Sequence, residues 1–143
     1  MNETHPLVGQ TITAIYLADD QGAIKFVLND GREIVARADG DCCSHTWIED
    51  VIAPEAAIGA EVMRAEDIDL PEEFTQPTKT DHYEDETSYY GFVIETAKGR
   101  CTLAYRNSSN GYYGGDLSWP GDRFYGGVFG QNNSKKEWQL VAS

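Results

Sequence analysis

The segment from Ser108 to Tyr113, SSNGYY, has the residue types of a ligand-binding turn, and it follows a strand-like stretch that ends in Arg106. Glycine lets backbone amides approach a ligand closely, and aromatic rings stack on nucleobases. Asparagine pairs with the hydrogen-bonding edges of bases, and arginine is a bidentate partner for phosphate. Asn-Gly is also a strong hairpin signal, so the same residues could close two strands and place their tyrosines in the core. The residues alone leave both interpretations open.

Two clusters of glycine and aromatic residues supply the candidate ligand-binding residues. The first cluster contributes Phe92, Arg106, Ser109, Asn110, Gly111, Tyr112 and Tyr113, with Arg106 as the phosphate partner. The second cluster extends from Trp119 to Gly130 around Arg123, which completes the candidate set. It admits the same two interpretations, a binding surface or core packing.

A metal centre or a catalytic centre is less well supported. Asp41 to His45 (DCCSH) holds potential metal ligands, but adjacent cysteines rarely reach one tetrahedral ion together, and no second ligand pair completes the set. A cysteine nucleophile activated by His45 would need an orienting third group and a lowered thiol pKa. His82 lies in an acidic stretch, where a solvated histidine is the simpler interpretation. We therefore expect no metal, no cofactor and no catalytic residue, and hence no enzyme.

The composition limits the class of partner. The 143 residues carry a formal net charge of −13 and are 41% hydrophobic, which suits one globular core. Such a surface repels a phosphate backbone, so we expect no long nucleic acid as a partner, whereas a few local arginines can still hold a small anion. There is no signal-peptide pattern at the start, no apolar run of about 18 residues, and an odd number of cysteines, 3, which suits reduced thiols. We expect a cytoplasmic protein without a membrane contact.

Alternation of apolar residues predicts antiparallel strands in the first part of the chain. Gln10 to Ala18, Ala23 to Asn29 and Arg32 to Ala38 are typical of a three-stranded meander, joined by turns at Asp19 to Gly22 and at Asn29 to Gly31. The positions expected to face the core are Ile24, Phe26, Leu28, Ile34 and Ala36.

The segment from Asp39 to Ala60 is less regular. We expect one or two short helices between Cys42 and Ala60, one of them a turn from Pro54 to Gly59 with proline at its start and glycine at its end. Thr46 to Ile48 would suit a strand equally well. The expected fold class is therefore α+β, mainly antiparallel β-sheet with one or two short helices.

The second half of the chain returns to strand patterns after an acidic stretch. We expect a strand from Glu61 to Leu70, an exposed acidic loop from Pro71 to Glu86, a hairpin of Ser88 to Ala97 and Cys101 to Arg106 around Lys98-Gly99, and a closing strand from Lys136 to Ala142. Residues 1–143 are expected to form a single domain, in which 71–86 are the acidic loop and 114–143 are a glycine- and aromatic-rich extension.

Two segments, DCCSHTWIED from Asp41 to Asp50 and SSNGYY from Ser108 to Tyr113, resemble a family of small phage and prophage proteins, the Thoeris anti-defence sponges of the first type. The resemblance covers the chain from about Leu7 to Tyr113. It implies a homo-oligomer, encoded by a phage and acting in the cytoplasm of the infected bacterium. Such a protein captures cyclic ADP-ribose isomers, and in some members cyclic oligonucleotides, without hydrolysing them. The sequence departs from the family pattern in His45-Thr46-Trp47 after the cysteines and in its C-terminal extension.

The function we expect is therefore sequestration of a small cyclic nucleotide signal. An alternative is an acidic inhibitor of a host defence protein or nucleic-acid-binding protein, which the net charge of −13 favours. This alternative leaves the glycine and aromatic clusters unexplained. An enzyme that degrades the signal is least favoured, because no set of catalytic residues is complete.

Overall fold

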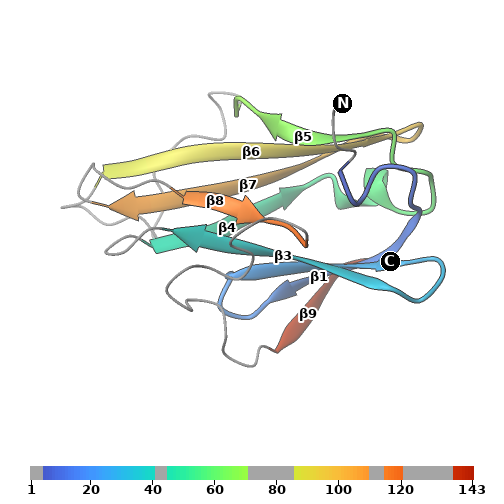
Figure 1. The fold of residues 1–143 in the computed structure, drawn as a ribbon, viewed down its shortest axis with the longest axis horizontal. Helices are drawn as coiled ribbons and strands as arrows, with labels where there is room; N and C mark the ends of the chain where they lie inside the picture. Colours follow the sequence, from blue (N-terminus) through green and yellow to red (C-terminus); the bar gives the residue numbers. More distant parts are fainter. Residues whose placement is uncertain (1–4, 41–44, 71–85, 110–114, 121–136) are drawn as a thin grey trace.

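Two antiparallel sheets make up the protein in this computed structural model, which describes residues 5–40, 45–70, 86–109, 115–120 and 137–143. One sheet has five strands in the order β8-β3-β2-β1-β9, and the other has four in the order β4-β7-β6-β5 (Figure 1). The strands are β1 (Ile12–Ala18), β2 (Ala23–Leu28), β3 (Glu33–Gly40), β4 (His45–Ile52), β5 (Arg64–Ile68), β6 (Glu86–Thr96), β7 (Gly99–Ser109), β8 (Gly115–Ser118) and β9 (Trp138–Ala142). Buried apolar residues of both sheets form one cluster, and the mainly antiparallel β-sheet architecture is confirmed.

The first three strands of the five-stranded sheet form the expected meander. The turn between β1 and β2 is closed by a hydrogen bond from Gln21 N–H to Ala18 O, 2.9 Å, and Gly22 N–H donates to Asp20 Oδ1 at 2.8 Å. At the next turn Gly31 has φ 89°, a conformation that glycine adopts without steric cost. The expected core positions are all buried: Ile24, Phe26, Leu28, Ile34 and Ala36. The closing strand expected at the end of the chain is β9, antiparallel to β1.

The four-stranded sheet is built on the hairpin of β6 and β7. Thr96 pairs with Gly99 across a turn of Ala97 and Lys98, so the hairpin signal in this region is confirmed. Thr96 Oγ1 accepts a hydrogen bond from Lys98 N–H at 3.1 Å and donates one to Ala56 O at 2.5 Å. The strands β4 and β5 flank the hairpin and form the two edges of this sheet.

The expected helices are the main error of the sequence-based fold. The one helical element among the described residues is a 3₁₀ turn, η1, from Pro54 to Ala57, which falls within the predicted turn and is followed by Gly59 at φ 82°. The residues before it, His45–Ile52, form strand β4. Thr46, Trp47 and Ile48 are β-branched or aromatic, and their pairing with β7 decides in favour of a strand. None of the helical segments in the described ranges is long and apolar enough to cross a membrane.

Aromatic rings from distant parts of the chain meet between the sheets. Trp119, which follows β8, has its ring centroid 5.7 Å from that of Phe26 and 4.9 Å from that of Phe92. The ring of His5 lies 4.3 Å from Trp119, and its Nδ1 accepts a hydrogen bond from Leu7 N–H at 3.1 Å. These contacts attach the start of the chain to the core.

The acidic loop predicted from Pro71 to Glu86 lies outside the described residues as far as position 85. Glu86 is the first residue of β6. The strand predicted from Glu61 to Leu70 is shorter in the structure and comprises Arg64–Ile68.

Candidate functional site

Arg106 lies near the end of β7, on the outer face of the four-stranded sheet, the face turned away from the five-stranded sheet. Its neighbours in β7, Tyr105 and Leu103, belong to the core cluster, and alternation along a strand directs Arg106 to the opposite side. The two residues directly across from it are Trp47 on β4 and Tyr89 on β6. An arginine is therefore placed between two aromatic residues by the register of three strands.

The guanidinium of Arg106 is buried, and its neighbours among the described residues include an aromatic ring and a carboxylate. Its Cζ atom lies 4.7 Å from the centroid of the Tyr89 ring, and its Nη1 lies 3.7 Å from Glu49 Oε1. Only 3% of the residue is exposed. Taking a charge out of water costs several kcal/mol unless opposite charge and polar or aromatic contacts compensate for it. Glu49 and Tyr89 provide that compensation.

Glu49 lies at a β-bulge in β4. The pairing register of β4 with β7 shifts between Ile48 and Asp50, which marks Glu49 as the bulged position. A bulge bends the strand and directs a side chain away from the regular alternation, and bulges are frequent beside functional sites. Trp47 lies opposite Arg106 and Ile48 is in the core, so alternation along β4 directs the Glu49 carboxylate to the face of Arg106.

The core face carries a second polar group at the same end of the sheet. Asn107 is fully buried, and its Nδ2 donates to Thr46 Oγ1 at 2.8 Å. Its Oδ1 has no hydrogen-bond partner within the part of the chain that the structure describes. Next to it, the Tyr105 ring stacks on Tyr90 at a centroid distance of 5.1 Å, and its hydroxyl donates to Asp67 Oδ1 at 3.2 Å. The core of the four-stranded sheet therefore becomes polar toward the end of β7.

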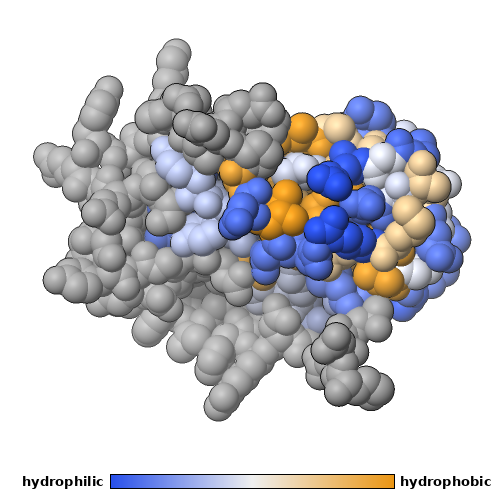
Figure 2. All heavy atoms as spheres, turned by 90° about the horizontal axis from the view of Figure 1, so that it is seen from above, coloured by the Kyte–Doolittle hydropathy of each residue, from blue (hydrophilic) through white to orange (hydrophobic). Residues whose placement is uncertain are grey.

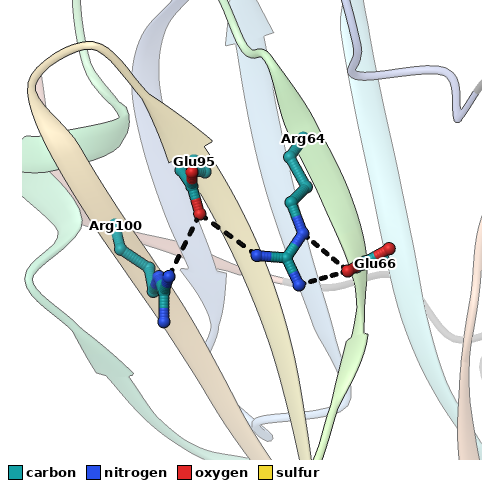
Figure 3. Close-up of polar contacts among 4 residues, drawn as sticks. All are labelled: Arg64, Glu66, Glu95 and Arg100. Atoms are coloured by element: carbon teal, nitrogen blue, oxygen red, sulfur yellow. Dashed lines mark hydrogen bonds and ion pairs between the residues drawn. The ribbon is translucent and has the colours of Figure 1, made fainter.

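The arginines at the other end of the outer face are paired at the surface. Arg64 Nη1 and Arg100 Nη2 lie 3.2 Å and 3.3 Å from Glu95 Oε2, and Arg64 also contacts Glu66 (Figure 3). The hydrogen bond of Arg64 with Glu66 and, to a smaller extent, its hydrogen bond with Glu95 raise the pKa of its guanidinium. Exposed ion pairs of this kind stabilise a protein by about 0 to 1 kcal/mol each. Figure 2 views the molecule from the side on which β5 lies. On the described part of this surface, hydrophilic and hydrophobic residues are interspersed. Arg106 differs from these arginines in being buried.

The structure divides the predicted site residues into three groups. Arg106 is on the outer face, and Ser109 is the last residue of β7, paired with Glu86. Phe92 pairs with Leu103 on the core face and packs on Trp119, on the other side of the sheet from Arg106. The remaining candidates lie outside the described residues: Asn110, Gly111, Tyr112, Tyr113 and Arg123. Sequence reasoning missed Trp47, Glu49 and Tyr89.

One protein-family profile, described as a domain of unknown function (DUF7448), matches residues 5–119. The chain belongs to this family. The DUF7448 match includes Arg106, Tyr89, Glu49 and both sheets except β9, which lies beyond the matched residues. No curated protein and no solved structure matches the chain.

The arrangement can bind an anion, and the described residues offer little other chemistry. In the ranges that the structure describes, no group of three or more His, Cys, Asp or Glu side chains could hold a metal ion. Cys101 is a buried, free cysteine, and burial, with a smaller effect of Glu55, raises the pKa of its thiol to about 12. A thiol that stays protonated is a poor nucleophile and a poor metal ligand. Cys42 and Cys43 lie outside the described residues.

Proposed function

We propose that this protein is a phage-encoded sponge that binds a cyclic nucleotide immune signal at the outer face of the four-stranded sheet and holds it without cleaving it. The observation that carries the proposal is the buried guanidinium of Arg106, held against the Tyr89 ring at the end of β7 that leads into the predicted SSNGYY turn. Arginine is the preferred side chain for phosphate, and an aromatic neighbour fixes its orientation in advance.

The positions of the two segments that resemble the Thoeris sponges also support the proposal. They are far apart in the sequence, yet His45 pairs with Ser108 and Thr46 pairs with Asn107 where β4 begins and β7 ends. Trp47 and Glu49, which belong to the first segment, are therefore close to Arg106, which lies two residues before the start of the second segment.

The binding model follows from the charges. A phosphate group competes with Glu49 for the Arg106 guanidinium, and the energy of the new charge-assisted contact offsets the loss of the internal ion pair. Asn110, Tyr112 and Tyr113 remain the predicted contacts for the base, with Gly111 and Ser109 shaping the turn. The ligand is a cyclic ADP-ribose isomer or a cyclic oligonucleotide, and the sponge acts as a homo-oligomer in the bacterial cytoplasm.

The proposal is tested by capture and release. The purified protein is incubated with a lysate in which the bacterial defence enzyme has been activated, then washed, heated and centrifuged, and the supernatant is examined by mass spectrometry. An unaltered cyclic nucleotide, released in proportion to the protein, supports a sponge. An altered nucleotide shows an enzyme, and no nucleotide favours the acidic inhibitor of a host protein. Protein with Arg106→Lys is the matched control, because lysine keeps the charge but lacks the planar guanidinium.

A further inference from the structure

In the part of the chain that the structure describes, the strands β4, β5, β8 and β9 lie at sheet edges. An edge strand presents backbone N–H and C=O groups to other chains, and proteins protect such edges with charges, short strands, bulges or a covering loop. The strand β5 has three charged residues, Arg64, Glu66 and Asp67, and β8 has only four residues. The strand β4 contains a bulge, and Gln21 covers it at Ile48, whose N–H donates to Gln21 O at 2.8 Å and whose O accepts from Gln21 Nε2 at 2.9 Å.

The strand β9 lacks comparable protection. It lies at the margin of the five-stranded sheet, beside β1 (Figure 1). Its sequence, WQLVA, contains no charged residue and no proline. Leu140 is 57% exposed, and it and Met63 are the large apolar side chains exposed among the described residues. An uncharged edge that exposes a leucine is typical of a strand that pairs with another chain.

The backbone groups of Trp138 and Leu140 point away from β1. Asp19 N–H donates to Glu137 O at 2.9 Å, so Glu137 faces β1, and the alternation of an antiparallel ladder makes Gln139 face β1 as well. The residues between and after them, Trp138 and Leu140, therefore present their N–H and C=O groups to the outer side of the edge. The pairing with β1 is regular through these residues and shifts only beyond Leu140.

The side chains of Trp138 and Leu140 share the outer face of the five-stranded sheet. Leu140 is opposite Tyr16, which is opposite Lys25, and both neighbours of Lys25 in β2 are core residues. Lys25 Nζ lies 4.8 Å from the centroid of the Trp138 ring and 5.0 Å from that of the Tyr16 ring. These cation–π contacts orient the indole beside the exposed leucine in the single chain.

A second copy of this chain is complementary to this edge. When two β9 strands pair antiparallel around a two-fold axis at Gln139, Trp138 of each copy lies opposite Leu140 of the other. Each exposed leucine is then covered by an indole, and the outward backbone groups of these residues bond to each other. Two chains that each carry a net charge of −13 repel one another, so their contact is favoured at a strand without charge.

We propose that β9 pairs with β9 of a second copy, so that the two five-stranded sheets become one continuous sheet across a homodimer. The strand lies beyond residues 5–119, so the interface is formed outside the part of the chain that the DUF7448 profile matches. The nucleotide site proposed above is on the other sheet, and the pairing of β9 does not depend on it.

The first experiment measures the mass of the purified protein by sedimentation equilibrium. Wild type should have the mass of two chains and Leu140→Glu that of one, because the carboxylate removes the apolar contact and adds to the repulsion between acidic chains. Met63→Glu is the matched control, since Met63 is 56% exposed and lies outside β9, and it should remain a dimer. Circular dichroism checks that both variants keep the sheet fold. A monomeric wild type, a dimeric Leu140→Glu or a monomeric Met63→Glu overturns the proposal.

The second experiment tests the register of the pair. Gln139 faces Gln139 of the second copy as a non-hydrogen-bonded pair with Cα atoms about 4.5 Å apart, a spacing that a disulfide can bridge. Mild oxidation should therefore link Gln139→Cys into covalent dimers on a non-reducing gel, well above the level in wild type. Glu66→Cys, at an exposed position on the edge strand β5, is the control and should show only the wild-type level. Gln139→Cys that links no more than Glu66→Cys contradicts this pairing, and neither experiment requires a nucleotide, so a failure of nucleotide capture leaves both results standing.

Discussion

Arg106 and Tyr89 face each other across the β6–β7 hairpin, with the guanidinium carbon 4.7 Å from the ring centroid, and both are held there by backbone pairing rather than by a flexible loop. A ligand-binding arginine on a strand loses less conformational entropy on binding than one on a mobile segment. Because Arg106 is only 3% exposed, replacing it should also change the stability of the fold.

Replacing Arg106 with alanine should destabilise the protein. The truncation leaves Glu49 without its buried cation and opens space between Trp47 and Tyr89, so we expect a loss of about 2 to 4 kcal/mol in the free energy of unfolding. Urea denaturation of wild type and Arg106→Ala measures the difference. An equal midpoint would mean that the ion pair contributes nothing to the fold.

Glu49→Gln should have opposite effects on stability and on binding. The unliganded protein loses the charge that balances Arg106 and should melt several degrees lower, by about 1 to 2 kcal/mol in unfolding free energy. The affinity of Glu49→Gln for a phosphate ligand should rise, because the variant removes a charged competitor for the Arg106 guanidinium. Thermal unfolding with and without cyclic ADP-ribose reports both effects in one series, and a ligand-induced rise in Tm no larger than that of wild type would argue against competition between Glu49 and the ligand.

Phe92→Ala should damage the fold and not the site. Phe92 packs on Trp119 and His5 inside the core, and removing a buried aromatic side chain costs about 3 to 5 kcal/mol. Phe92→Leu keeps most of the volume, so this variant should fold and bind a cyclic nucleotide with wild-type affinity. A selective loss of binding in folded Phe92→Leu would show that Phe92 belongs to the ligand site.

Cys101 should make stability fall in alkaline solution. Burial raises the pKa of its thiol from 9.0 in a solvated state to about 12 in the folded protein, so the unfolded chain releases its proton first as the pH rises. The contribution of the protonated Cys101 thiol to the free energy of unfolding is complete below pH 9 and is lost between pH 9 and about 12. Urea midpoints at pH 8 and pH 10 for wild type and Cys101→Ala check this, and an equal pH-dependent decrease in both proteins would assign the effect to other groups.

Local rules were sufficient for the hairpins of the fold. The predicted turn, Lys98-Gly99, is one residue further along the chain than the observed turn of Ala97 and Lys98, and only the observed turn sets Tyr89 opposite Arg106. Alternation assigned Phe26 to the core, and the pairing of β6 with β7 places Phe92 on the core face as well. Helix signals at Pro54 gave a 3₁₀ turn and no more, because the preceding β-branched residues found a partner strand.

The rest of the site depends on contacts between segments far apart in the chain. Glu49 lies at a β-bulge beside Arg106, and both the bulge and the pairing of β4 with β7 are tertiary features that composition does not specify. Gln21 contacts Ile48 only because the turn of one sheet meets the edge of the other. Tertiary relations of this kind require the topology before any residue can be assigned a role.

Titration calorimetry with cyclic ADP-ribose on wild type, Arg106→Lys and Arg100→Ala tests the central claim most directly. Arg100 lies on the same strand and face as Arg106 but is exposed and paired with Glu95, so Arg100→Ala tests whether any arginine on this face affects binding. We predict that wild type and Arg100→Ala bind with equal affinity and that Arg106→Lys binds about tenfold more weakly, because lysine keeps the charge but loses the planar fork of donors. Equal affinity in all three proteins, or weakening by Arg100→Ala alone, would contradict a nucleotide site at Arg106.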